Sequence, residues 1–264
     1  MIAIPHDKVE ALIAEANARF VMPRFGTLQA GEIDEKKAND FVTVADREAE
    51  AFLAPRLADL IVGSHVLGEE AAAHDPSLMR RLDAETPLWV IDPVDGTRSF
   101  IEGKDGFAVI VALVRGDAVL AGWILQPRRA RFVASEHGAG VRLDGGPPVI
   151  PAPRRARGYF LGRVPDGARA RERAAAAFEA QAHPGSGAVA FLDMAAGAID
   201  IAYFGRGWPW DHAAGALIAE ELGGAARFLA GPTRYTPRRW NEPLLITRSP
   251  ALWDDALRVL TVAT

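Results

Sequence analysis

Two aspartates three residues apart, Asp92 and Asp95, are the best-placed residues of this sequence for chemistry. They follow the apolar run Trp89–Ile91, which predicts a short buried strand with Asp92 at its end. Pro93 fixes φ and lacks a backbone donor, so we expect the strand to stop there. Two carboxylates on one rigid turn can converge on a hard cation such as Mg²⁺, which prefers oxygen ligands in proteins.

The residues after this strand add a second chemical feature. Asp95 and Gly96 predict a turn, and Thr97 begins what we expect to be a short helix. The backbone N–H groups of Gly96 and Thr97 would be free at that helix start, where a phosphate oxygen binds well. The alternative is that both aspartates are ordinary turn and cap residues, and this segment alone leaves the two interpretations open.

Composition narrows the functional classes. The 264 residues are 49% hydrophobic and 24% charged, which is typical of a globular protein with one large or two compact domains. A net charge of −4 gives no electrostatic case for nucleic acid or an anionic membrane. The sequence has no cysteine, which excludes disulfides, thiolate metal sites and cysteine nucleophiles and fits a cytoplasmic location. We find neither a signal peptide at Met1–Phe20 nor a run near the ~18 apolar residues of a membrane span.

The first half predicts an α+β arrangement. Apolar spacing indicates a helix over residues 8–22 and another that begins at Asp46, with a kink or restart at Pro55. Residues 26–40 predict a mobile loop or hairpin, and residues 71–87 predict a loop. We expect strands at Ser64–Leu67, Phe107–Val114, Ala118–Leu125, Arg131–Ser135 and Val141–Leu143.

The second half predicts an α/β arrangement, because strands and helices alternate along it. Gly- and Pro-rich segments around residue 148 indicate a boundary, so we predict domains over residues 1–148 and 149–264. The expected elements are strands at Tyr159–Gly162, Ile199–Tyr203, Ala225–Leu229 and Leu244–Thr247, and helices at residues 167–182, Ser186–Ala196, Asp211–Leu222 and from Ser249 to about Val262.

Three further acidic positions lie at predicted strand ends or helix starts. Glu69 and Glu70 follow Gly68, whereas Asp46 and Asp211 each begin a predicted helix. Taken singly, each has an ordinary explanation as a helix cap or a solvated charge. Their combination with the central turn favours one shared acidic site.

These segments together resemble the Mg²⁺-dependent, lithium-sensitive inositol monophosphatase family. Its signatures DPxDGTxxF and WDxAAG match Asp92–Phe100 and Trp210–Gly215. Its NDxVTxxD and GEE segments match Asn39–Asp46 and Gly68–Glu70 in the same order. The resemblance implies the family's layered αβαβα sandwich and a phosphomonoesterase that binds two or three Mg²⁺ ions, with Mn²⁺ as a substitute. It also implies a small-molecule substrate and a homodimer.

The resemblance assigns metal ligands residue by residue. A first ion would take Glu69, Asp92 and the Val94 carbonyl, and a second would take Asp92, Asp95 and Asp211. A third, looser ion would use Glu69 and water. These assignments come from the matched motifs and not from spacing alone.

The resemblance also implies catalytic roles. Glu69 and the Thr97 hydroxyl, oriented by Asp46, would accept a proton from a water activated by metal, and that water would attack phosphorus in line. The Gly96 and Thr97 amides would bind the phosphoryl group. Asp211 would lie near the leaving oxygen and help a water to protonate it.

The part of the site that would recognise the alcohol departs from the family pattern. Inositol-hydrolysing members carry a glutamate seven residues before the WD aspartate, where this sequence has Phe204, with Arg206 close by. We expect a pocket rim of Gly185, Ser186, Gly187, Ala188, Ala190, Phe204 and Arg206. Whether Arg206 faces substrate or solvent stays open, and Lys36 matches the family's lysine in the mobile loop over the site.

Other polar and aromatic residues have plainer interpretations. We expect His212 on a helix surface, and the other histidines singled out show no ligand spacing: His65, His74, His137 and His183. The six tryptophans are more typical of a core and a pocket lip than of a base-stacking platform.

Several substrates remain open within the superfamily. Histidinol phosphate, a nucleotide 3′-phosphate and a sugar bisphosphate are the alternatives to an inositol-1-phosphate-type ester. The DREAE segment at Asp46–Glu50 also occurs in histidinol-phosphate relatives, whereas WDHAAG favours the inositol group. A non-catalytic binding protein is a different class, and the joint presence of the acidic ligands and Thr97 argues against it.

Overall fold

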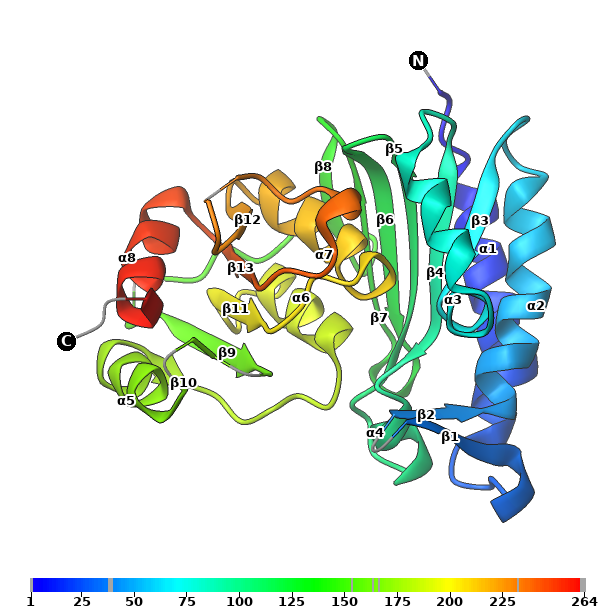
Figure 1. The fold of residues 1–264 in the computed structure, drawn as a ribbon, viewed down its shortest axis with the longest axis horizontal. Coiled ribbons are helices and arrows are strands. Elements are labelled where there is room, and N and C mark those ends of the chain that lie inside the picture. The colour runs from blue at the N-terminus through cyan, green and yellow to red at the C-terminus, as the bar shows by residue number, and fades with distance from the viewer. Residues whose placement is uncertain are drawn as a thin grey trace.

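The computed structural model describes residues 2–37, 40–152, 154–162, 164–165, 167–231 and 233–261. Asn39 of the NDxVTxxD match and the predicted helix end at Val262 lie outside these residues. Helical and sheet layers alternate across the molecule (Figure 1). The order is α1 and α2, the larger sheet, α6 and α7, the smaller sheet, then α5 and α8. This is the expected αβαβα sandwich.

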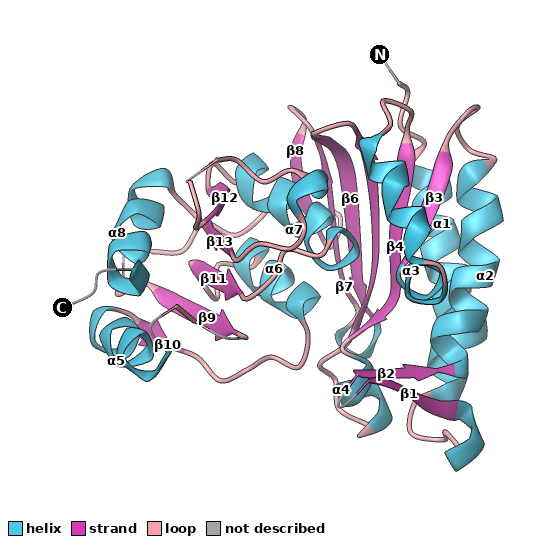
Figure 2. Cartoon of the chain, in the orientation of Figure 1, coloured by secondary structure: helices cyan, strands magenta, loops and turns pink. Residues whose placement is uncertain are grey.

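The larger sheet has the order β3-β4-β5-β6-β7-β8 within the described residues (Figure 2). Only the β3–β4 pair is parallel among them, and the following strands form the predicted antiparallel meander. Its strands are β3 (His65–Gly68), β4 (Leu88–Asp95), β5 (Ala108–Arg115), β6 (Ala118–Gln126), β7 (Arg131–Glu136) and β8 (Gly140–Leu143).

The smaller sheet has the order β10-β9-β11-β13-β12 within the same residues. The β10, β9 and β11 strands are parallel, and β13 is antiparallel to both of its neighbours. Its strands are β9 (Arg157–Leu161), β10 (Glu179–Ala180), β11 (Ile201–Phe204), β12 (Ala225–Phe228) and β13 (Leu244–Thr247). A separate hairpin pairs β1 (Ile33–Lys37) with β2 (Asp40–Thr43). The boundary at residue 148 stays a prediction.

The helices fill the space between and outside the sheets. The α-helices are α1 (His6–Ala16), α2 (Val44–Ala58), α3 (Glu69–His74), α4 (Thr97–Ile101), α5 (Gly167–Ala177), α6 (Gly187–Ala195), α7 (Pro209–Glu221) and α8 (Pro250–Thr261). A π-turn, η1 (Asn17–Val21), extends α1, and the 3₁₀ segments are η2 (Met22–Arg24), η3 (Ala30–Glu32), η4 (Pro76–Asp83), η5 (Pro127–Arg129) and η6 (Pro237–Arg239). Within the described residues, none of the helices has the length and apolar character needed to cross a membrane.

The apolar run of β4 explains why both faces of the larger sheet are covered by helices. Trp89 and Ile91 pack with the α1 and α2 residues, whereas Leu88 and Val90 pack with α6 and α7. Because side chains alternate across a strand, a nearly continuous apolar run buries both faces of the sheet. The strand therefore lies in the middle of the molecule, and its polar end is held in place by two cores.

Several local predictions were wrong. Residues 71–87 are not a loop, because α3 and η4 occupy most of them. The α2 helix does not restart at Pro55 but runs through it, with buried Leu53 and Leu57 on either side of it in the chain. Asp46 does not begin that helix, because Thr43 is the N-cap and Asp46 closes a capping box in the first turn. Asp211 likewise lies in the first turn of α7, which begins at Pro209.

Candidate active site

The central turn joins β4 to α4. Contrary to expectation, β4 continues past Pro93 to Asp95, because the register against β5 shifts between Asp92 and Asp95. A bulge of this kind tolerates a proline that cannot donate to the ladder. Gly96 follows in the left-handed region at φ +91, and a Cβ there would lie 2.5 Å from the Gly106 carbonyl oxygen. Only glycine fits this turn.

Sheet topology brings distant carboxylates to this turn. Because β3 and β4 are parallel neighbours with Gly68 opposite Ile91, Glu69 comes to lie beside Asp92. The first turn of α7 supplies Asp211 from the other half of the chain. One carboxylate oxygen from each of Glu69, Asp92 and Asp211 lies within 4.8 Å of the others. Three segments far apart in sequence therefore meet at one point.

Asp95 faces the start of α6. The Ala188 backbone N–H donates to Asp95 Oδ2 at 2.6 Å, and Ser186 is the N-cap of the same helix. A carboxylate at a helix N-terminus is favoured by the helix dipole. Asp95 thus ties the turn between β4 and α4 to the C-terminal half of the chain.

On the other side of the turn, the Thr97 hydroxyl lies close to the Asp46 carboxylate. Thr97 Oγ1 is 3.5 Å from Asp46 Oδ1 and 3.1 Å from the Val94 carbonyl oxygen. Asp46 Oδ2 accepts from the Thr43 hydroxyl at 2.5 Å and from the Thr43 amide at 2.9 Å. Asp46 is therefore fixed by Thr43 and can orient Thr97.

Lys36 on the β1–β2 hairpin neutralises part of the acidic site. Its Nζ lies 2.9 Å from Glu69 Oε1 and 3.0 Å from Glu70 Oε1. Although burial lowers it, the pKa of Lys36 is raised overall by attraction to Glu69 and Glu70. The ion pairs of Lys36 with Glu70 and with Glu69, a predicted metal ligand, thus anchor the hairpin over the site.

Glu50 is a site residue that the sequence interpretation missed. Its buried carboxylate accepts from the Glu70 amide at 2.9 Å and from the Ala71 amide at 2.8 Å. It therefore caps α3, whose N-cap residue Gly68 has no side chain to do so. A Cβ at Gly68 would lie 2.1 Å from the Glu50 carboxyl carbon, so the cap also explains the glycine.

Burial shifts the titration of these acids. Burial and the neighbouring carboxylates raise the pKa of Asp92 and of Asp211 well above the usual range. Burial raises the pKa of Asp95 to about 6 and that of Asp46 to about 6. Burial and the adjacent Glu69 raise the pKa of Glu70 to about 8. A bound cation would oppose each of these shifts, because its charge favours the ionised carboxylate.

The donor set fits a hard divalent cation. Glu69, Asp92 and Asp211 offer only oxygen atoms, at mutual distances that one ion can bridge. Val94 and Asp95 line the same cavity as these three residues. Metal-free, the cluster holds several carboxylates that disfavour one another's charge, so binding of an ion stabilises it.

A pocket of about 490 Å³ adjoins the cluster on the Asp95 side. Gly185, Ser186, Gly187, Phe204 and Arg206 line it, as does His212. Ala188 and Ala190 have fully buried side chains, so Ala188 contributes only its amide and Ala190 lies in the core.

His212 lies in the interior, which contradicts the expected surface position. It is 3% exposed, its Nδ1 lies 3.0 Å from the Trp208 carbonyl oxygen, and its ring meets Phe204 edge to face. Burial lowers the pKa of His212 to about 4, so the imidazole is neutral. The reason is that α7 lies between the two sheets and buries almost every face.

Known proteins resemble this chain in sequence and in fold. The model described as the inositol monophosphatase family matches residues 6–256. Inositol-1-monophosphatase SuhB of Mycobacterium tuberculosis is 33% identical over 280 aligned positions, covering 95% of this chain and 91% of its own. The Nus factor SuhB of Vibrio cholerae is 32% identical over 212 positions, covering 76% of each chain. The solved Thermotoga maritima IMPase has a TM-score of 0.80 at 23% identity, covering 97% of this chain and 95% of its own.

Proposed function

The chain belongs to the inositol monophosphatase family and is a phosphomonoester hydrolase, and we propose that it uses Mg²⁺ to hydrolyse a small phosphorylated alcohol of the inositol-1-phosphate type. One observation carries this proposal. Glu69, Asp92 and Asp211 converge within 4.8 Å beside the Thr97–Asp46 pair. The family consists of metal-dependent phosphatases, and this cluster is where the ions would bind.

The chain's own residues divide the work. Glu69, Asp92, Asp95, Asp211 and the Val94 carbonyl would hold two or three ions, which when bound polarise phosphoryl oxygens and activate water. The Gly96 and Thr97 amides would orient the phosphate. Mn²⁺ is expected to replace Mg²⁺, because both accept an octahedral set of oxygens.

Proton transfer follows from the Thr97 contacts. The Thr97 hydroxyl can donate to Asp46 or to the Val94 carbonyl, which leaves its oxygen lone pairs free to accept a proton from the attacking water. Asp46, whose Oδ1 lies 3.5 Å from the Thr97 hydroxyl, would receive the proton that Thr97 passes on. Glu69 would share this role, and Asp211 would assist the departing alcohol oxygen.

The alcohol pocket favours a substrate other than inositol itself. Phe204 takes the place of an acidic acceptor, so inositol hydroxyls facing it stay unpaired, at ~1–3 kcal/mol each. Arg206 is exposed at the pocket, with its guanidinium 5.8 Å from the Trp208 ring centre, and offers a charged fork to a second phosphate or a carboxylate. We propose an anionic or more apolar alcohol.

The test compares phosphate release, as kcat/KM with Mg²⁺, from inositol 1-phosphate, histidinol phosphate, adenosine 3′,5′-bisphosphate and fructose 1,6-bisphosphate. The wild type should favour one of the last three, and Arg206→Ala should reduce that preference if the second anion binds Arg206. A clear preference for inositol phosphate that the variant leaves unchanged would refute the substrate proposal and keep the reaction class.

Cellular properties are proposed on the same basis. We propose a cytoplasmic homodimer, from the family resemblance and from a sequence without cysteine. The small phosphomonoester is the expected partner, and the net charge of −4 gives no reason to propose nucleic acid or membrane binding. Gel filtration with light scattering would measure the oligomeric state.

A further inference from the structure

A second pocket, of about 480 Å³, also opens at the acidic cluster. Among the described residues, it shares only Asp211 and Trp208 with the alcohol pocket, and Glu69 and Lys36 border it as well. Its size is in the range of small-molecule sites. A molecule whose phosphate lies at the turn between β4 and α4 can therefore extend from Asp211 in either of two directions.

Three indoles line this pocket. Trp208 stacks on Trp240 with ring centres 4.5 Å apart and planes at 13°, and on Trp210 at 5.1 Å and 12°. Trp208 and Trp240 are half-buried, so the stack is not closed within the core. The other three tryptophans, Trp89, Trp123 and Trp253, are fully buried. The three at the pocket thus form a separate aromatic surface.

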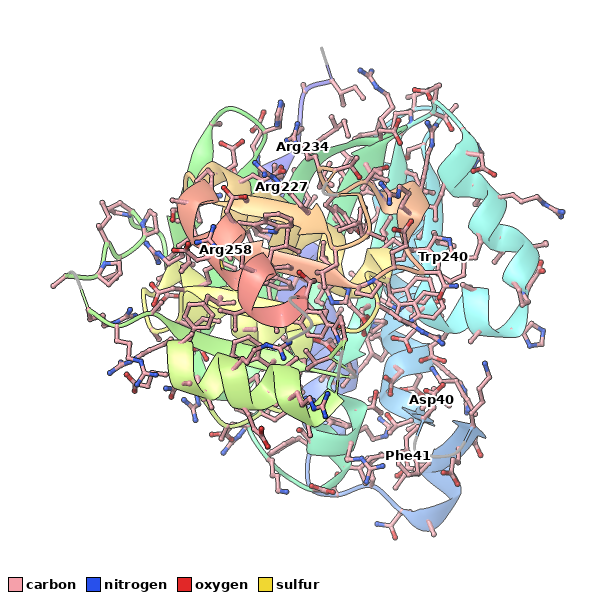
Figure 3. The ribbon with its side chains drawn as sticks, turned by 60° about the vertical axis from the view of Figure 1, so that its left-hand side comes forward. Asp40, Phe41, Arg227, Arg234, Trp240 and Arg258 are labelled. Atoms are coloured by element: carbon pink, nitrogen blue, oxygen red, sulfur yellow. The ribbon has the colours of Figure 1, made fainter. Side chains whose placement is uncertain are left out.

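Apolar residues from the other half of the chain also line the pocket: Ala72 and Ala73 of α3, and Pro76 and Met79 of η4. Lys37 and Asp40 of the β1–β2 hairpin lie beside them. A flexible thioether in such a lining accommodates flat ligands of varied outline. Figure 3 shows Trp240 and Asp40 on the same side of the molecule, and both residues line this pocket.

Hydrogen bonds connect the segment that carries Trp240 to the end of η4. Arg238, on η6 next to Trp240, donates to the Leu82 carbonyl at 2.9 Å and the Asp83 carbonyl at 3.0 Å at the end of η4, and it pairs with Glu85 at 2.7 Å. The Gly207 amide donates to the Trp240 carbonyl at 3.0 Å. This bond joins the segment between β11 and Trp208 to Trp240. These hydrogen bonds therefore hold the pocket in shape.

Resting on the proposed phosphatase activity, we propose that this pocket binds a planar aromatic ring carried by the substrate alcohol, stacked on Trp240 at the end of the Trp210–Trp208–Trp240 stack. A planar ring matches indoles that are parallel within 13°. A quaternary ammonium prefers rings that enclose it from several directions, which a parallel stack does not provide. A polyol could pair its hydroxyls only with the charged residues of the lining, and those facing Met79, Pro76 and the alanines would stay unpaired.

The test uses two esters with the same phosphate and the same CH₂–O link: benzyl phosphate, whose ring is planar and aromatic, and cyclohexylmethyl phosphate, whose ring is not. The wild type should show a kcat/KM about tenfold higher for benzyl phosphate, in line with ring stacking of at least about 1.4 kcal/mol. Trp240→Leu should bring the ratio close to one, and Trp240→Phe should restore most of it. Phe204→Leu, in the other pocket, is the matched control and should keep the ratio.

Each failure has its own signature. A wild-type ratio near one, a ratio unchanged by Trp240→Leu, or a preference for phosphocholine over benzyl phosphate would overturn the aromatic pocket alone. If no ester releases phosphate with Mg²⁺, the proposed function fails. The Kd values of the two esters are then measured by quenching of tryptophan fluorescence and compared. Equal Kd values, or no binding, would overturn the pocket as well. Should circular dichroism show that Trp240→Leu is unfolded, Met79→Gln in the same lining serves in its place.

Discussion

Removing the Glu50 carboxylate should loosen the helix that carries Glu69. In Glu50→Ala, the Glu70 and Ala71 amides lose the acceptors that lie 2.9 and 2.8 Å away. A hydrogen bond to a charged group contributes ~1.5–3 kcal/mol, and a helix cap about 0.5–2 kcal/mol. Burial raises the pKa of Glu50, so part of this gain is already offset by the cost of burying its charge.

We therefore expect Glu50→Ala to lower the free energy of unfolding by about 2–3 kcal/mol, measured by urea denaturation. Activity with Mg²⁺ should fall as well, because Glu69 begins the helix that has lost its cap. Glu48→Ala is the matched control on the same helix: its carboxylate is 40% exposed and pairs with Arg24 at 3.3 Å. An exposed pair of this kind contributes about 0–1 kcal/mol. Equal stability and equal activity of the two variants would refute the capping role.

Two further predictions concern the acidic cluster. Asp92→Asn should cut kcat by several orders of magnitude while circular dichroism and the urea midpoint stay close to wild type, since Asp92 is the proposed bridging ligand; near-normal turnover would exclude that assignment. With the metal chelated, stability should fall as pH rises from about 4 to about 8, because burial raises the pKa of Asp46 to about 6 and of Glu70 to about 8. These groups hold protons in the folded chain that the unfolded chain has already released, so folding is favoured at the lower pH. Thermal midpoints at pH 5 and 8, with chelator and with Mg²⁺, check this; a midpoint that rises with pH under chelation would contradict it.

The sequence was most informative where one local pattern decides the structure. The apolar run before Asp92 predicts a strand buried on both faces, and Gly96 predicts the turn after it. The strand end was misplaced because a bulge absorbs Pro93, and a bulge depends on the partner strand. The run of polar residues after Glu70 hid α3 and η4, although the alanines at its start are good helix formers.

Local sequence patterns cannot predict that the acidic residues converge. Glu69 meets Asp92 only because β3 lies parallel to β4, and Asp211 arrives only because α7 packs on the same sheet. The matched motifs indicated this grouping, whereas spacing alone could not. Two misses did leave a signal in the sequence. Asp46 and Glu50 lie one turn apart on a single helix face, and the apolar neighbours of His212 on every side of α7 indicate a buried helix.

Metal-dependent phosphate release tests the central claim most directly. Protein stripped of metal by a chelator should release no phosphate from a responsive ester. Added Mg²⁺ should restore release in a saturable way, Mn²⁺ should substitute, and Ca²⁺ should inhibit because it tolerates looser coordination geometry. Full activity after exhaustive chelation would contradict the assignment of Glu69, Asp92 and Asp211 as the ligands of a catalytic cation.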